Sequence, residues 1–216
     1  MSVDVHDLQA RFNRAALAAG ATRPREGVFT DLVARYREPH RHYHTLCHID
    51  ACLSWLDWFW AAAEHADEVE LALWFHDAVY SPGATDNERQ SARLACDQLK
   101  ALGVDAAKAE RVARYIEATE HVAPISGDAG LVVDLDLTIL GAPARDFEVF
   151  EQQIRREYAE VPDSMYRLGR SHVLQGFVSR PYIYHLPQLR EHLESAARAN
   201  LGRRIDELSG MADLTI

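Results

Sequence analysis

At residues 71–80 the sequence reads LALWFHDAVY, an apolar run in which His76 and Asp77 stand among residues that prefer the interior. A buried imidazole or carboxylate without a partner costs several kcal/mol. A metal ion is the strongest candidate to satisfy the pair, because a borderline cation binds imidazole nitrogen and carboxylate oxygen together. Backbone carbonyls or a nearby arginine are the alternative partners. The rest of the chain has to decide between these interpretations.

The spacing of apolar residues predicts an all-α fold. Helical periodicity predicts helices over residues 7–19, 25–36, 44–64, 68–80, 87–102, 106–120, 143–160, 164–179 and 186–208. Residues 131–140 alternate apolar and polar side chains, which is typical of a strand, but a lone strand is not stable. We therefore predict a short buried helix there, ended by Gly141. The expected architecture is a single-domain helical bundle over residues 1–216, with about nine or ten helices.

Composition and charge narrow the classes of partner. The formal net charge of -10 argues against binding to a nucleic-acid polymer, although a small phosphorylated substrate can still be held locally by a metal and a few arginines. The three cysteines are odd in number and form no CxxC pair, so we expect no disulfide framework and a cytoplasmic location. We expect neither a signal peptide nor a membrane span.

Two further sites carry possible metal ligands. His44 and His48 are four residues apart, which places both on one side of a helix, and the apolar residues after His48 predict that it points inward. Asp134 and Asp136 lie within an otherwise apolar run. Together with His76 and Asp77 they form a mixed nitrogen and oxygen ligand set. That ligand set is typical of a site for a divalent Mn, Fe, Co, Ni, Zn or Mg ion, rather than of a structural site built from thiolates.

These residues belong to four ordered sequence blocks, which read RxYHxxxHI from Arg41, WFHDAVY from Trp74, DNE from Asp86 and DLDLxILG from Asp134. In this order they resemble the HD superfamily of metal-dependent phosphohydrolases, and in particular its small stand-alone branch of predicted HD-type phosphohydrolases. The resemblance implies a helical HD-type domain with its metal motifs in residues 41–141 and helices in 143–208 completing the core. The four ligand positions match His48, His76, Asp77 and Asp136.

The resemblance implies hydrolysis of a small phosphate ester, such as a nucleotide, by metal-activated water. Asp77 and Glu88 are then the expected catalytic residues, with Glu88 as a base or proton donor. Arg41, His44 and Asn87 are the expected substrate-binding residues. Arg41 belongs to a locally basic segment, residues 35–44, and is predicted to clamp a phosphate.

Several assignments keep alternatives at this point. Asp134 fits the last ligand position nearly as well as Asp136, and Glu88 also fits a helix N-terminal charge. His121 is either a ligand of a second metal or a cation at a helix C-terminus, and His44 is either such a ligand or a phosphate hydrogen-bond donor. Two other functions also stay open: a non-catalytic binding or sensor module of the HD type, and a di-iron oxygenase on the same scaffold.

Overall fold

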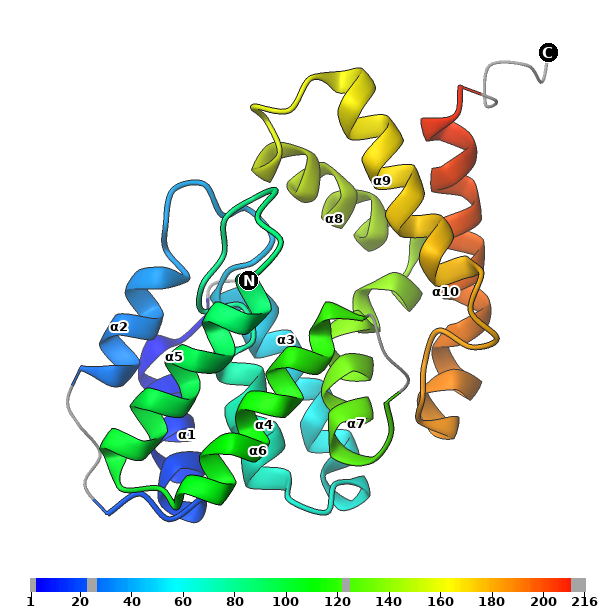
Figure 1. Ribbon diagram of the computed structural model, residues 1–216. Coiled ribbons are helices and arrows are strands. Elements are labelled where there is room, and N and C mark those ends of the chain that lie inside the picture. The colour runs from blue at the N-terminus through cyan, green and yellow to red at the C-terminus, as the bar shows by residue number, and fades with distance from the viewer. Residues whose placement is uncertain (1–2, 23–26, 122–124, 211–216) are drawn as a thin grey trace. The chain divides into compact units, whose positions relative to one another are not determined.

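The computed structural model describes residues 3–22, 27–121 and 125–210, and in these ranges it is all-helical, without strands, which confirms the predicted fold class (Figure 1). The chain divides into two compact units, Met1–Asp136 and Leu137–Ile216. The expected single domain over 1–216 stays a prediction, and each unit is described here by itself. No helix among the described residues is long and apolar enough to cross a membrane.

The first unit contains seven α-helices in its described part, with two short 3-10 helices. Their bounds are α1 Val5–Ala18, α2 Val28–Arg35, α3 Leu46–Phe59, η1 Trp60–Ala62, α4 Ala66–Phe75, α5 Asn87–Leu102, α6 Ala106–Glu117, η2 Ala118–Glu120 and α7 Gly127–Asp136. Residues 25 and 26, where the second predicted helix was expected to begin, lie outside the described residues.

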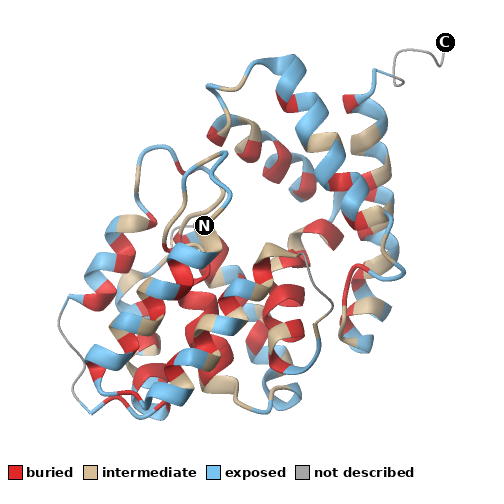
Figure 2. Ribbon diagram, viewed as in Figure 1, coloured by how far each residue is buried: buried red, intermediate tan, exposed pale blue. Residues whose placement is uncertain are grey.

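Helix α4 is the centre of the first unit. It packs against α1, α3, α5, α6 and α7, and every residue from Glu68 to Phe75 is buried (Figure 2). The ring of Trp74 has no exposed surface and meets the rings of Phe12 and Phe29 edge-on at centroid distances of 5.6 and 5.9 Å. The apolar run that begins at Leu71 is therefore the core of this unit.

Two predicted helix boundaries near the candidate ligands were wrong. The third helix begins at Leu46 rather than at residue 44, because the Thr45 side chain accepts a hydrogen bond from the backbone N–H of Cys47 and caps it there. Helix α4 ends at Phe75 rather than at residue 80. The Ser91 hydroxyl of α5 bonds both the N–H and the carbonyl of Val79, at 3.0 and 3.2 Å, so a tertiary partner takes the backbone groups that a longer helix would use.

The start of α4 depends on a residue from α7. The Asp128 side chain is buried, and its two carboxylate oxygens accept hydrogen bonds from the backbone N–H groups of Glu64 and His65, each at 2.8 Å. His65, at the N-cap position of α4, makes no capping bond with its own side chain. Asp128 thus anchors the N-cap of the central helix from a distant part of the chain, because it accepts from the N-cap N–H as the acidic side chain of a capping box does.

Replacing Asp128 with alanine should therefore lower the free energy of unfolding by about 2 kcal/mol, the upper end for a lost cap. Chemical denaturation of the two proteins measures this difference. Substitution of Asp146, which lies in the first turn of α8, is the matched control, and an equal loss in both variants would contradict the capping role.

The second unit consists of η3 Leu137–Gly141, α8 Ala144–Glu157, α9 Asp163–Val178 and α10 Pro187–Leu208. The predicted short buried helix at 131–140 is thus observed as α7 followed by η3, and Pro143 stands at the N-cap of α8. A Cβ on Gly141 would lie 2.7 Å from the Leu193 Cβ, so only glycine allows η3 to approach α10 this closely. The Asn200 amide bonds the carbonyls of Leu140 and Ala142, each at 2.9 Å.

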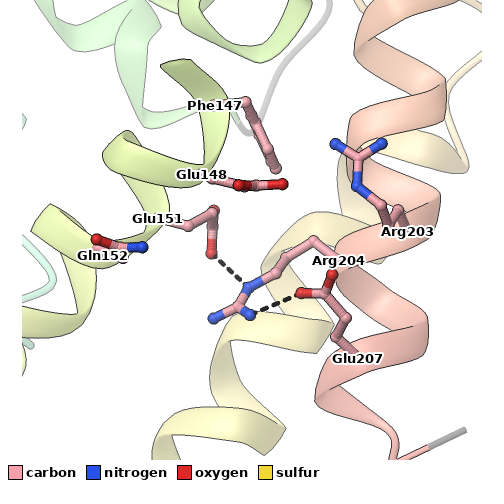
Figure 3. Close-up of a pocket in the computed structure, with 7 residues that line it drawn as sticks. All are labelled: Phe147, Glu148, Glu151, Gln152, Arg203, Arg204 and Glu207. Atoms are coloured by element: carbon pink, nitrogen blue, oxygen red, sulfur yellow. Dashed lines mark hydrogen bonds and ion pairs between the residues drawn. The ribbon is translucent and has the colours of Figure 1, made fainter. Parts of the chain in front are cut away.

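A pocket of about 190 Å³ lies between α8 and α10 in this unit (Figure 3). The buried Glu151 carboxylate accepts from Arg204 at 3.0 Å, and Arg204 also donates to Glu207 at 2.9 Å. Arg170 pairs with Glu151 as well. Each of these charged groups is neutralised by a partner within the unit. We therefore interpret the cluster as a structural ion-pair network.

Candidate metal centre

Two imidazoles and two carboxylates from three helices of the first unit meet at one point. His48 lies in the first turns of α3, His76 and Asp77 directly follow α4, and Asp136 is the last residue of α7. Each offers one ligand atom, and these four atoms all lie within 4.8 Å of one another. The structure therefore brings together all four residues predicted as principal ligands.

The separations between these atoms suit a common central ion. His48 Nε2 lies 3.1 Å from His76 Nε2 and 3.1 Å from Asp136 Oδ1, and His76 Nε2 lies 3.0 Å from Asp77 Oδ2. The cross distances from His48 to Asp77 and from His76 to Asp136 are 3.6 and 3.5 Å. Ligand atoms held about 2.1 Å from one ion are separated by about 3.0–3.4 Å when they are neighbours in octahedral or tetrahedral geometry.

The hydrogen bonding of His76 presents a lone pair to the cluster. Its Nδ1 lies 2.9 Å from the Leu73 carbonyl oxygen, which can only accept, so Nδ1 carries the proton. In the neutral imidazole, Nε2 is then unprotonated and faces the other three side chains. A ring nitrogen fixed in this way by a backbone carbonyl is the usual arrangement of a metal-binding histidine.

The two carboxylates of the cluster are stabilised by a positive charge near them. Asp77 Oδ2 is buried and accepts no hydrogen bond from the described residues. Burial alone would lower the pKa of His76, but Asp77 and Asp136 outweigh it and hold that pKa well above its usual range. Burial would likewise raise the pKa values of Asp77 and Asp136, but the histidines outweigh it and lower both. A proton on His76 or a metal ion can supply the charge, and a metal would displace that proton.

The surroundings of His48 are largely apolar. It shares the buried side of α3 with Ile49, Cys52, Leu53 and Leu56, as the sequence pattern predicts. The Cys52 sulfur lies 3.7 Å from the imidazole nitrogens of His48, and burial, together with the charges of Asp136 and Asp77, raises the pKa of the thiol well above its usual range. Cys52 therefore stands beside the cluster as a neutral thiol.

Asp136, rather than Asp134, enters the cluster. Asp134 is fully buried within α7 and is absent from the group of converging ligand atoms. Two residues along a helix correspond to a rotation of about 200°, so only one of these carboxylates can point toward the cluster.

The two extra histidines lie at the edge of the cluster. His44 precedes α3, so it does not share a helical face with His48 as expected; its ring instead packs 4.2 Å from that of Tyr80 and 6.1 Å from that of His48. His121 Nε2 lies 3.9 Å from Asp136 Oδ2. His121 has a φ of 60°, a left-handed conformation that no other described non-glycine residue adopts.

Asn87 and Glu88 are the first two residues of α5. The Asn87 Oδ1 accepts from the Ser81 N–H and its Nδ2 donates to the Ser81 carbonyl, each at 3.0 Å, so Asn87 anchors the 81–86 loop. Burial raises the pKa of Glu88, and the negative charges of Asp77 and Asp136 raise it further. The substrate-binding role of Asn87 stays a prediction.

Arg41 does not lie where a phosphate clamp requires it. Its side chain has no exposed surface, and its N–H groups donate to Glu38 and to the backbone carbonyls of His44, Asp77 and Ala78. A guanidinium with no exposed surface cannot contact a dissolved phosphate in this conformation. Sequence reasoning missed these contacts, because they join residues 36 and 37 positions apart.

No protein-family model, curated protein or solved structure matches this chain significantly. The assignment of a function therefore depends on the geometry and chemistry of the site.

Proposed function

We propose that this protein is a metal-dependent phosphohydrolase that cleaves a small phosphate ester. The observation that carries the proposal is the convergence of His48, His76, Asp77 and Asp136 on one point, with Nε2 of His76 and a buried carboxylate oxygen of Asp77 facing each other there. The reducing cytoplasm is the expected location, because all three cysteines are free thiols.

A divalent ion held by these four residues would lower the pKa of a bound water and polarise a phosphoryl oxygen. Asp77 is placed to orient that water, because its side chain keeps a partly exposed surface of 16% while Oδ2 faces the histidines. His44 lies at the edge of the cluster, with its ring centroid 6.1 Å from that of His48, so it can donate a hydrogen bond to an anionic substrate near the ion.

Glu88 is the proposed proton donor to the leaving group. Its raised pKa keeps the carboxyl protonated to a higher pH than an ordinary glutamate, so activity should fall as the pH rises through this raised pKa. Glu88→Gln should lower kcat by about 100-fold and remove this alkaline limb from the pH–rate profile. Glu117→Gln, at the end of α6, is the matched control. An unchanged alkaline limb in Glu88→Gln would exclude Glu88 as the donor.

The proposed activity is tested on metal-stripped protein that is then loaded with Mn²⁺ or Co²⁺. Release of phosphate from a chromogenic ester or from nucleotides should require the metal and should be lost in Asp77→Asn. Hydrolysis by the metal-free protein at the same rate would overturn the proposal. Tight binding of a nucleotide to the loaded protein without turnover would instead favour a non-catalytic binding module.

The positions of the extra histidines favour a second candidate, a di-iron oxygenase. His121 faces the second carboxylate oxygen of Asp136 at 3.9 Å, so Asp136 and His121 could serve a second ion beside the first. Elemental analysis of the purified protein separates the two functions. About two irons per chain would favour the oxygenase, and one divalent ion would favour the phosphohydrolase.

A further inference from the structure

Arg41 is buried between the segment that precedes α3 and the segment that follows α4. It lies in the connection from α2 to α3, and its guanidinium carbon stands 5.2 Å from the ring centroid of Tyr36 and 5.4 Å from that of Tyr80. Its side chain is fully buried, although buried arginines are rare unless every charge is matched.

The hydrogen bonds of Arg41 converge on the end of the central helix. Nη1 donates to the Asp77 carbonyl at 2.7 Å and Nη2 donates to the Ala78 carbonyl at 3.2 Å. Carbonyl groups at a helix C-terminus lack partners within the helix and attract positive charge. Arg41 therefore holds the backbone just after α4 from another segment of the chain, at the residue that carries a proposed metal-binding carboxylate.

The same guanidinium also holds the segment before α3. Nη1 lies 3.3 Å from the His44 carbonyl, and Nε donates to Glu38 Oε2 at 2.9 Å. One planar group thus bonds the backbone of Asp77, Ala78 and His44 at fixed relative directions. A lysine ammonium, with a single nitrogen, cannot reproduce this fork of donors.

We propose that Arg41 is the positioning residue of the metal centre: by binding the carbonyls of Asp77 and Ala78, it fixes the backbone that presents the Asp77 carboxylate to the ion. This inference rests on the proposed metal centre and adds a residue outside the ligand set. It replaces the phosphate-clamp role that the basic segment 35–44 had suggested.

The test is the affinity of metal-stripped protein for Co²⁺, measured by calorimetry and by the visible absorption of the bound ion. Arg41→Lys should weaken binding by about 10–100-fold, the usual cost of losing a partner that orients a metal ligand, and should change the Co²⁺ spectrum. Circular dichroism establishes that the variant is folded at the temperature of the titration.

One matched control separates positioning from general damage. Arg35→Lys makes the same replacement at a nearby arginine, which pairs with Asp31 on the surface of α2 at 3.1 Å. This variant should keep the wild-type affinity and spectrum. If Arg41→Lys does not fold, Tyr80→Leu, which removes one ring from the guanidinium, should weaken Co²⁺ binding in the same direction.

The outcomes distinguish this inference from the function on which it rests. A folded Arg41→Lys protein, or failing that a folded Tyr80→Leu protein, with wild-type affinity and an unchanged spectrum would overturn the positioning role alone. A wild-type protein that binds no Co²⁺ would overturn the metal centre itself.

Discussion

Replacing His76 with alanine is expected to abolish metal binding and, with it, any metal-dependent hydrolysis. The imidazole supplies one of four ligand atoms, and its Nε2 lies within 3.0–3.5 Å of the other three. Loss of an outer partner of a ligand already costs about 10–100-fold in affinity, so loss of the ligand itself should exceed that range. The remaining carboxylates would also lie next to each other without the imidazole between them.

Metal content and Co²⁺ titration measure this effect directly. His6→Gln is the matched control, because His6 is an exposed histidine of α1 in the same unit. The control should bind metal like the wild type. An His76→Ala protein that retains a full equivalent of metal would show that the ion is held elsewhere.

Replacing Trp74 with alanine is expected to cause the largest loss of stability in the chain, about 3–5 kcal/mol. Trp74 has no exposed surface, packs between Phe12 and Phe29, and belongs to the helix on which the other helices of the first unit pack. The cavity left by the indole cannot close without moving α1 and α2. Denaturant unfolding, followed by circular dichroism, measures the change.

Trp58 provides the matched control for this substitution. It lies in α3 with 84% of its surface exposed, so Trp58→Ala should change the free energy of unfolding by no more than about 0.5 kcal/mol. Equal losses from the two substitutions would contradict the assignment of α4 as the core of the first unit.

Much of the fold could be predicted from local patterns. The bounds of α5, Asn87–Leu102, agree with the prediction, because an acidic first turn and Gly103 in the left-handed conformation mark its two ends within the chain itself. The convergence of His48, His76, Asp77 and Asp136 also agrees with the predicted ligand set. Each of these residues interrupts an apolar run, and a polar residue in such a run signals a partner inside the core.

Other features could not be predicted, because their causes lie far away in the chain. Helix α4 stops at Phe75 since Ser91 and Arg41 take the backbone groups that follow it. The choice between Asp134 and Asp136 depends on the rotation of α7 relative to α3 and α4, which neighbouring residues do not encode.

The sequence by itself determined that this protein is helical, that residues 71–75 form part of a core helix and that His76 and Asp77 need a partner in the core. These properties depend on periodicity and on the cost of burying polar groups, both of which act locally. Only the tertiary structure decided that Asp136 completes the cluster and that Arg41 donates to the backbone carbonyls of Asp77 and Ala78. Those assignments depend on hydrogen-bond directions between segments that are distant in sequence, and such directions exist only once the helices have packed.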